Sequence, residues 1–308
     1  MHIAQIGTGR VGRPTAYAIL CAELVDTLTV CDTKLGLAKA FGEELKHVTA
    51  SIGLDVEILS CDQDEDVTDA DIILVSAGKP RTPGVQMTRR DLAVQNGQIV
   101  KQIAQSTVEN NCDAKYVVIT NPVDAMAMIC KKYTDADFVI STGTNLESLR
   151  FRAGLAEALC VPVSSVEGFV GGEHGTDAII LWSTVKVNGL SLAEYLGLSG
   201  KTLCKADLDN YVKSVSKLIV DNIGGTEFGP AAAFRDIVRA IVKDTNELIP
   251  VAAPTCFEGI PEPVTVGVPL GRGACIGRSI FDGLTIEEQK GIRDAANAIY
   301  QTKSVDIC

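Results

Sequence analysis

The strongest constraint on the fold is a strand–helix alternation that fills the N-terminal half of the chain. Several of its β-rich runs are continuously apolar, as expected for strands whose two faces are both covered by helices. Strands that alternate with helices predict right-handed crossovers and a doubly wound parallel sheet. The predicted strands are 3–6, 27–31, 56–59, 71–76, 116–120 and 138–141, and the predicted helices include 13–22, 35–48 and 90–110.

The alternation stops near residue 143. We therefore predict an N-terminal Rossmann-type domain over 1–143 and a C-terminal α+β domain over 144–308. Thr285-Ile-Glu-Glu288 has the spacing of a capping box at the start of a last helix. The other elements predicted after the boundary are helices at 146–159, 208–223 and 228–243, strands at 166–170 and 179–187, and a β region at 248–270.

A glycine-rich turn follows the first predicted strand, with Gly7, Gly9 and Gly12 in the spacing G-x-G-x-x-G. Such glycines allow a tight turn, let the backbone approach a pyrophosphate, and bring the next helix close to the strand. Asp32 ends the second predicted strand, where a carboxylate accepts hydrogen bonds from ribose hydroxyls and repels a 2′-phosphate. The pattern predicts dinucleotide binding and favours NAD, although Lys34 leaves NADP open.

Composition excludes several other classes of function. The 308 residues carry 28 basic and 39 acidic side chains, a net charge of −11, which disfavours nucleic acid and anionic membrane surfaces as partners. The apolar runs fall far short of the roughly 20 residues that span a bilayer. The strand pattern begins two residues after Met1, so we expect no signal peptide. The ten cysteines form no CxxC pair, which predicts free thiols in a reducing cytoplasm and no metal site.

The connection after the fourth predicted strand contains three arginines. Arg81 lies between two prolines, and Arg89 and Arg90 lie at the start of the next predicted helix. Cations are disfavoured at a helix N-terminus, and ligands of open α/β sheets bind at the carboxyl ends of the strands. The segment 79–90 therefore predicts a lid that places guanidinium groups over an anionic substrate.

Only three histidines can supply a general base at neutral pH. His2 begins the chain and His47 falls in an amphipathic helix, positions typical of packing or surface residues. His174 lies in Gly171-Gly-Glu-His-Gly175, a glycine-rich turn between two predicted strands, which makes it the candidate. Its carboxylate partner cannot be selected from sequence distance alone.

Taken together, five ordered motifs resemble the L-lactate and L-malate dehydrogenase family, and most closely its archaeal and bacterial malate dehydrogenases of lactate-dehydrogenase type. The resemblance covers the whole chain. The motifs are the glycine turn with Asp32, the arginine lid, Thr120-Asn-Pro-Val-Asp124, Leu146-Glu-Ser-Leu-Arg150 and Gly172-Glu-His-Gly175.

The resemblance implies an NAD-dependent enzyme of the tricarboxylic acid cycle that interconverts malate and oxaloacetate in the cytoplasm, as a homotetramer or homodimer. His174 then exchanges the hydroxyl proton, Arg150 grips the C1 carboxylate as a fork, and Arg89 polarises the C2 carbonyl. Asn121, whose bond to Pro122 is cis in relatives, contacts the substrate oxygen, and Thr226 lines the pocket wall. Cofactor contacts are implied for Gly7, Gly9, Arg10, Val11, Gly12, Asp32, Ala77, Gly78, Asn96, Thr120 and Asn121.

Substrate choice depends on Arg81, which stands where malate enzymes of the family carry Arg and lactate enzymes carry Gln. A lid two residues longer than usual, with Val85-Gln86 inserted, leaves other 2-hydroxy acids open, lactate or sulfolactate among them. Glu147 replaces the usual Asp as partner of His174, so Asp177 is a local alternative. A dinucleotide-binding protein with decayed catalysis is the remaining alternative.

Overall fold

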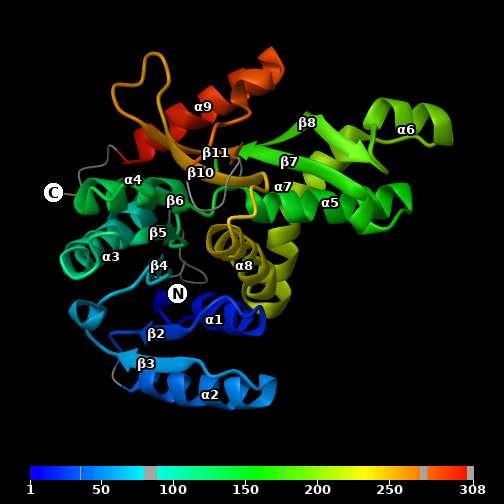
Figure 1. The fold of residues 1–308 in the computed structure, drawn as a ribbon. Helices are drawn as coiled ribbons and strands as arrows, with labels where there is room; N and C mark the ends of the chain where they lie inside the picture. Colours follow the sequence, from blue (N-terminus) through cyan, green and yellow to red (C-terminus); the bar gives the residue numbers. More distant parts are fainter. Residues whose placement is uncertain (35, 80–88, 176, 271–275, 304–308) are drawn as a thin grey trace.

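A single mixed sheet of eleven strands runs through the part of the chain that the computed structural model describes, namely residues 1–34, 36–79, 89–175, 177–270 and 276–303 (Figure 1). The strand order is β3-β2-β1-β4-β5-β6-β10-β11-β7-β8-β9. The strands are β1 (His2–Ile6), β2 (Thr27–Cys31), β3 (Glu57–Cys61), β4 (Ile72–Val75), β5 (Lys115–Val118), β6 (Val139–Ser141), β7 (Val166–Gly172), β8 (Ala178–Val187), β9 (Leu190–Ser191), β10 (Ile249–Thr255) and β11 (Val264–Leu270).

Strands β1 to β6 are parallel and form the predicted Rossmann sheet. Successive residues of β1 enter different cores, because side chains alternate across a sheet: Ile3 packs under the first two helices and Ala4 under the next two. Both faces are therefore covered, which explains why the strands read as continuous apolar runs. The four helices are α1 (Gly12–Cys21), α2 (Leu37–Ile52), α3 (Arg89–Val108) and α4 (Val123–Thr134).

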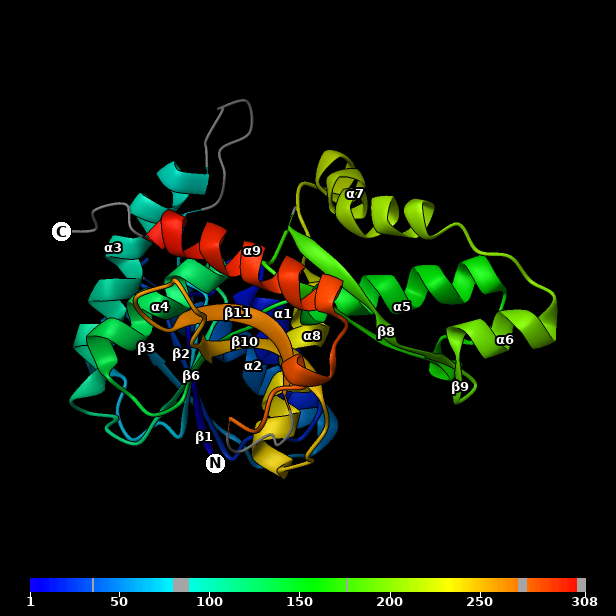
Figure 2. The ribbon, with the colours of Figure 1, turned by 90° about the horizontal axis from the view of Figure 1, so that it is seen from above.

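The strands after β6 pair antiparallel, so the fold class predicted for the C-terminal part is confirmed. The capping box is present as predicted: the Glu288 N–H donates to Thr285 Oγ1 at 3.3 Å, and the Thr285 N–H donates to Glu288 Oε2 at 2.9 Å. The helices are α5 (Asn145–Leu159), α6 (Leu192–Ser199), α7 (Lys205–Ile223), α8 (Phe228–Lys243) and α9 (Ile286–Lys303). Figure 2 shows α5, α6, α7 and the strands β7 to β9 extending away from the parallel sheet.

Helix α8 comes from the C-terminal half of the sequence, yet it packs on the parallel sheet beside α1 (Figure 1). Phe234 and Ile237 share one core with Ile19 and Leu20 of α1. The sheet itself is also continuous, since Ala252 of β10 pairs with β6. The domain boundary near residue 143 stays a prediction.

The alternation implies a helix where α4 lies, but the sequence patterns did not predict α6 or the short strand β9. At the ends of other helices and strands, the predicted and observed bounds differ by a few residues. For example, α2 continues to Ile52 and is capped by Gly53, which has a left-handed φ of 71°. No helix in the described ranges is long and apolar enough to cross a membrane. The 3₁₀ turns are Asp64–Asp66, Val163–Ser165 and Phe281–Gly283.

Candidate active site

The glycine turn between β1 and α1 has a different steric requirement at each glycine. A Cβ on Gly7 would lie 2.4 Å from the backbone nitrogen of Ala77, and one on Gly12 would lie 2.0 Å from the carbonyl oxygen of Gly7. A Cβ on Gly9 would meet nothing within 4 Å. Two glycines therefore permit the close packing of turn, strand and helix, while Gly9 faces open space at the N-terminus of α1, where a pyrophosphate fits.

Asp32 follows β2 and is held in place by the same turn. Its Oδ2 accepts hydrogen bonds from the Thr8 N–H at 2.8 Å and the Thr8 hydroxyl at 2.9 Å, and its Oδ1 accepts one from the Lys34 N–H at 3.0 Å. Because Asp32 is only half-buried, its remaining lone pairs can accept from the hydroxyls of a ribose. Sequence reasoning missed Thr8; its position inside the glycine turn was the available signal.

The loops after β4 and β5 are tied together next to the glycine turn. Thr120 Oγ1 donates to the carbonyl oxygen of Ala77 at 2.7 Å, and a Cβ on Gly78 would lie 2.7 Å from Thr120 Cγ2. The buried Asn96 accepts from the Lys79 N–H at 2.8 Å and donates to the Asn121 carbonyl at 2.7 Å. Asn96 thus positions both loops at the sheet edge where the cofactor is expected.

Asn121 occupies the start of the turn before α4. Its peptide bond to Pro122 is cis, as the resemblance implied. The Asn121 side chain is exposed, and its amide has no hydrogen-bond partner among the described residues. The amide is therefore available to a ligand.

His174, Glu147 and Arg150 form one cluster, in which Glu147 is buried and the other two side chains are half-buried. His174 Nδ1 lies 3.1 Å from Glu147 Oε2, and Arg150 Nη1 donates to Glu147 Oε1 at 3.4 Å. Glu147 and Arg150 are one turn apart on α5, which brings both side chains to the same face. Glu147, which is one methylene longer than an aspartate, reaches the imidazole of His174, which follows β7.

A second carboxylate, Asp124, fixes the backbone of the histidine turn. Its Oδ2 accepts the His174 N–H at 3.0 Å, and its Oδ1 accepts the Ser141 hydroxyl at 2.7 Å. Asp124 is fully enclosed, and this burial raises the pKa of its carboxyl although both hydrogen bonds oppose the shift. Sequence reasoning quoted Asp124 within a motif but did not assign it to the site.

Electrostatics prepare His174 for proton exchange. Burial alone lowers the pKa of His174, but the charge of Glu147 and its hydrogen bond outweigh this effect, so the pKa is raised above the ordinary imidazole value. Burial likewise opposes ionisation of Glu147, yet His174 and Arg150 together hold its pKa below the usual range. The geometry therefore stabilises an ionised carboxylate beside an imidazole that readily accepts a proton.

The remaining predicted residues are only partly described. Arg81 lies outside the described residues, and so does the side chain of Arg89, the first residue of α3. Thr226 is half-buried just before α8. Arg10 forms an ion pair with Glu227, next to Thr226, and its Nη1 donates to the Ile223 carbonyl at 3.3 Å. The glycine turn thus contacts the segment that carries Thr226.

The other two histidines lie apart from this cluster. His2 Nε2 is 2.8 Å from Thr29 Oγ1, and His47 is exposed on α2. A cavity of about 560 Å³ lies beside His2 and contains none of the residues implicated in catalysis.

Comparison with known proteins agrees with this geometry. Residues 1–138 match the model of the lactate/malate dehydrogenase NAD-binding domain, and residues 144–301 match the α/β C-terminal domain of the same family. A malate dehydrogenase of Sulfurisphaera tokodaii is 41% identical over 90% of this chain and 87% of its own length. An L-lactate dehydrogenase of a Thermoanaerobacter species is 32% identical over 82% of this chain and 81% of its own.

The crystal structure of a minor L-lactate dehydrogenase from Enterococcus mundtii superposes with a TM-score of 0.89 at 28% identity, covering 99% of both chains. The family model of the NAD-binding domain and the dehydrogenase relatives indicate NAD as the cofactor, and the open face at Gly9 and the anchored Asp32 are compatible with it. The chain therefore belongs to the lactate/malate dehydrogenase family and is an NAD-dependent 2-hydroxyacid dehydrogenase.

Proposed function

We propose that this dehydrogenase interconverts L-malate and oxaloacetate. The observation that carries the catalytic assignment is the position of Glu147, whose two oxygens meet His174 and Arg150. The 41% identical malate dehydrogenase of Sulfurisphaera tokodaii supports the dicarboxylate.

His174 is the acid–base group of this proposal. An ionised carboxylate only accepts hydrogen bonds, so the hydrogen between Glu147 and His174 resides on Nδ1 and the neutral ring has its lone pair on Nε2. Nε2 takes the hydroxyl proton of malate, and the resulting imidazolium is stabilised by Glu147. When bound, NAD supplies the acceptor for the hydride that leaves C2.

Arg150 provides the anchor for the C1 carboxylate. Its guanidinium is largely buried and has one weak contact with Glu147, which leaves further N–H donors to form a fork with a carboxylate. Asn121 then donates to the substrate oxygen, Arg89 stabilises the charge that develops there, and Thr226 bounds the substrate tail.

Arg81 selects the second carboxylate in this proposal. Its guanidinium pairs with that group in oxaloacetate, whereas pyruvate offers only a methyl group and would leave a desolvated cation unpaired. The test follows NADH oxidation with oxaloacetate, pyruvate and sulfopyruvate in the wild type and in Arg81→Gln. We expect oxaloacetate to be the preferred substrate and to lose at least about 100-fold in kcat/KM on substitution, with little loss for pyruvate.

The second candidate is a dehydrogenase for another 2-hydroxy acid, favoured by the lactate dehydrogenases among the relatives. A higher kcat/KM for pyruvate or sulfopyruvate than for oxaloacetate would establish it. NADH binding without turnover of any 2-oxo acid would instead support the decayed-enzyme alternative, against which the His174–Glu147 contact argues.

The cellular setting is also part of the proposal. The eight cysteines that the structure describes are free thiols, which supports the reducing cytoplasm. The net charge of −11 supports small molecules over nucleic acid as partners. The homotetramer or homodimer stays a prediction, and size-exclusion chromatography with light scattering tests it.

A further inference from the structure

Two cysteines are neighbours at the carboxyl ends of β2 and β3. Cys31 is the register partner of Cys61 across this parallel pair. Neighbouring strands lie about 4.8 Å apart, inside the range of about 4.4–6.8 Å between the Cα atoms of a disulfide. Both side chains pack against the same hydrophobic core, on one face of the sheet. Because β3 is an edge strand and Cys61 is its last residue, a small shift that brings the sulfurs together disturbs little else.

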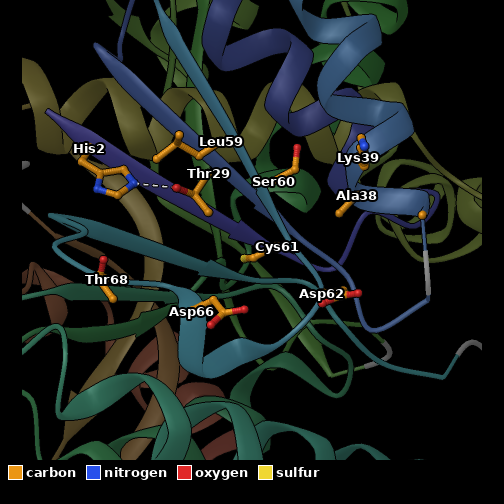
Figure 3. A pocket seen from close by; sticks show the side chains of 11 residues that line it. His2, Thr29, Ala38, Lys39, Leu59, Ser60, Cys61, Asp62, Asp66 and Thr68 are labelled. Carbon is orange, nitrogen blue, oxygen red and sulfur yellow. Dashed lines mark hydrogen bonds between the residues drawn. The ribbon is translucent and has the colours of Figure 1, made fainter.

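Only one of the two thiols can be reached from solvent. Cys31 is fully buried, while Cys61 is half-buried and lines the cavity of about 560 Å³ (Figure 3). His2, Leu59 and Asp66 also line this cavity. A small oxidant therefore reaches Cys61, and Cys31 can react only through Cys61.

The surroundings divide the chemistry between the two sulfurs. Contact with Cys31 lowers the pKa of the Cys61 thiol, whereas contact with Cys61 and burial raise that of Cys31. Cys31 Sγ lies 3.7 Å from Asp64 Oδ1, and burial raises the pKa of this carboxyl, which makes it a suitable proton acceptor. Cys61 is the nucleophile because it is the thiol that solvent reaches. Neighbouring aspartates repel anionic oxidants, and their charges partly oppose the lowering of the Cys61 pKa.

The backbones of both cysteines support the cofactor site. The carbonyl of Cys31 accepts the Gly7 N–H at 2.8 Å, and the carbonyl of Cys61 accepts the Asp32 N–H at 3.2 Å. Gly7 begins the phosphate turn, and Asp32 is the ribose ligand. If a disulfide draws the ends of β2 and β3 together, both the phosphate turn at Gly7 and the ribose-binding Asp32 are expected to move.

We propose that Cys31 and Cys61 form an oxidisable dithiol, that a small neutral peroxide converts it to a disulfide, and that the disulfide weakens NAD binding. In the first step the Cys61 thiolate attacks one peroxide oxygen, the O–O bond breaks, and hydroxide leaves and is protonated to water. Cys61 is then a sulfenic acid. Asp64 takes the Cys31 proton, the Cys31 sulfur attacks the Cys61 sulfur, the S–O bond breaks, and the leaving hydroxide takes the proton back from Asp64 to become a second water. The two thiols lose two electrons and the peroxide gains them.

The covalent step is tested on the complete protein treated with hydrogen peroxide and then alkylated. We expect a cross-linked peptide pair containing Cys31 and Cys61, which dithiothreitol separates. Oxidised glutathione, a bulky anion, should give much less of it. Recovery of both cysteines as alkylated thiols, or of Cys61 as a sulfinic acid without the cross-link, would overturn the proposal.

The functional step is tested by the NADH dissociation constant, measured by fluorescence before and after oxidation. We expect a rise of about tenfold or more, because one displaced hydrogen bond to the cofactor is worth about 1.4 kcal/mol. Cys61→Ser, at a half-exposed position, should abolish the rise that oxidation causes. Cys160→Ser, at an exposed site after α5, is the matched control and should still show it. Quantitative cross-linking with an unchanged dissociation constant would overturn the coupling to NAD.

Discussion

His174 Nδ1 and Glu147 Oε2 lie 3.1 Å apart, which places a glutamate in the role that the family usually gives to an aspartate. Glu147 also meets Arg150, so one carboxylate contacts both the imidazole and the guanidinium that we propose as the substrate anchor.

Replacing Glu147 by Gln tests the electrostatic part of this contact. Reduction of a 2-oxo acid needs the imidazolium, so its rate falls as the pH rises through the pKa of His174. Glu147 raises that pKa, and its loss should move the descending limb to lower pH and reduce kcat by about 100-fold or more. Glu147→Asp is the control, because it keeps the negative charge but moves the carboxylate away from His174. We expect a lower kcat and a smaller shift of the descending limb of the pH profile than in Glu147→Gln. Identical pH profiles in all three proteins would contradict the assignment.

Asp32 should control the choice between the two coenzymes. In Asp32→Ser the repulsion of a 2′-phosphate is lost, and we expect the ratio of kcat/KM for NADPH to that for NADH to rise by about tenfold or more. Thr8→Val removes the hydroxyl that donates a hydrogen bond to Asp32. It should therefore weaken NADH binding a few-fold while preserving the preference for NADH over NADPH. Steady-state kinetics with both coenzymes decide the matter; an unaltered ratio in Asp32→Ser argues against a ribose contact.

The glycine turn offers a pair of matched substitutions. Gly12→Ala forces a Cβ to within 2.0 Å of the Gly7 carbonyl oxygen, so we expect the free energy of unfolding to fall by about 2–3 kcal/mol. Gly9→Ala meets no atom of the protein, so stability should hardly change while NADH binding weakens by about tenfold. Thermal denaturation and fluorescence titration separate the two effects. Equal stabilities of the two variants would refute the steric account.

Arg10 and Glu227 should couple cofactor binding to the segment before α8. In Glu227→Gln the ion pair is lost and the guanidinium of Arg10 is free to meet the pyrophosphate, so NADH and ADP-ribose should bind about threefold more tightly. Adenosine lacks the phosphates and serves as the control ligand, with unchanged affinity. Tighter binding of adenosine as well, or weaker binding of NADH, would show that the pair acts only on the structure.

The sequence by itself determined the elements that depend on local pattern. The strand–helix alternation gave the parallel sheet, since buried strands must be continuously apolar, and the spacing of Gly7, Gly9 and Gly12 located the phosphate turn. Thr285 and Glu288 likewise defined the start of α9, because a capping box is formed by residues three apart.

Only the tertiary structure decided which distant groups meet. His174 and Glu147 are 27 residues apart, and the hydrogen bond from the His174 backbone to Asp124 spans 50. The packing of α8 against α1 joins segments separated by about two hundred positions, as the Arg10–Glu227 pair shows. Such contacts depend on how whole helices and strands pack, and no local pattern of side chains encodes that geometry.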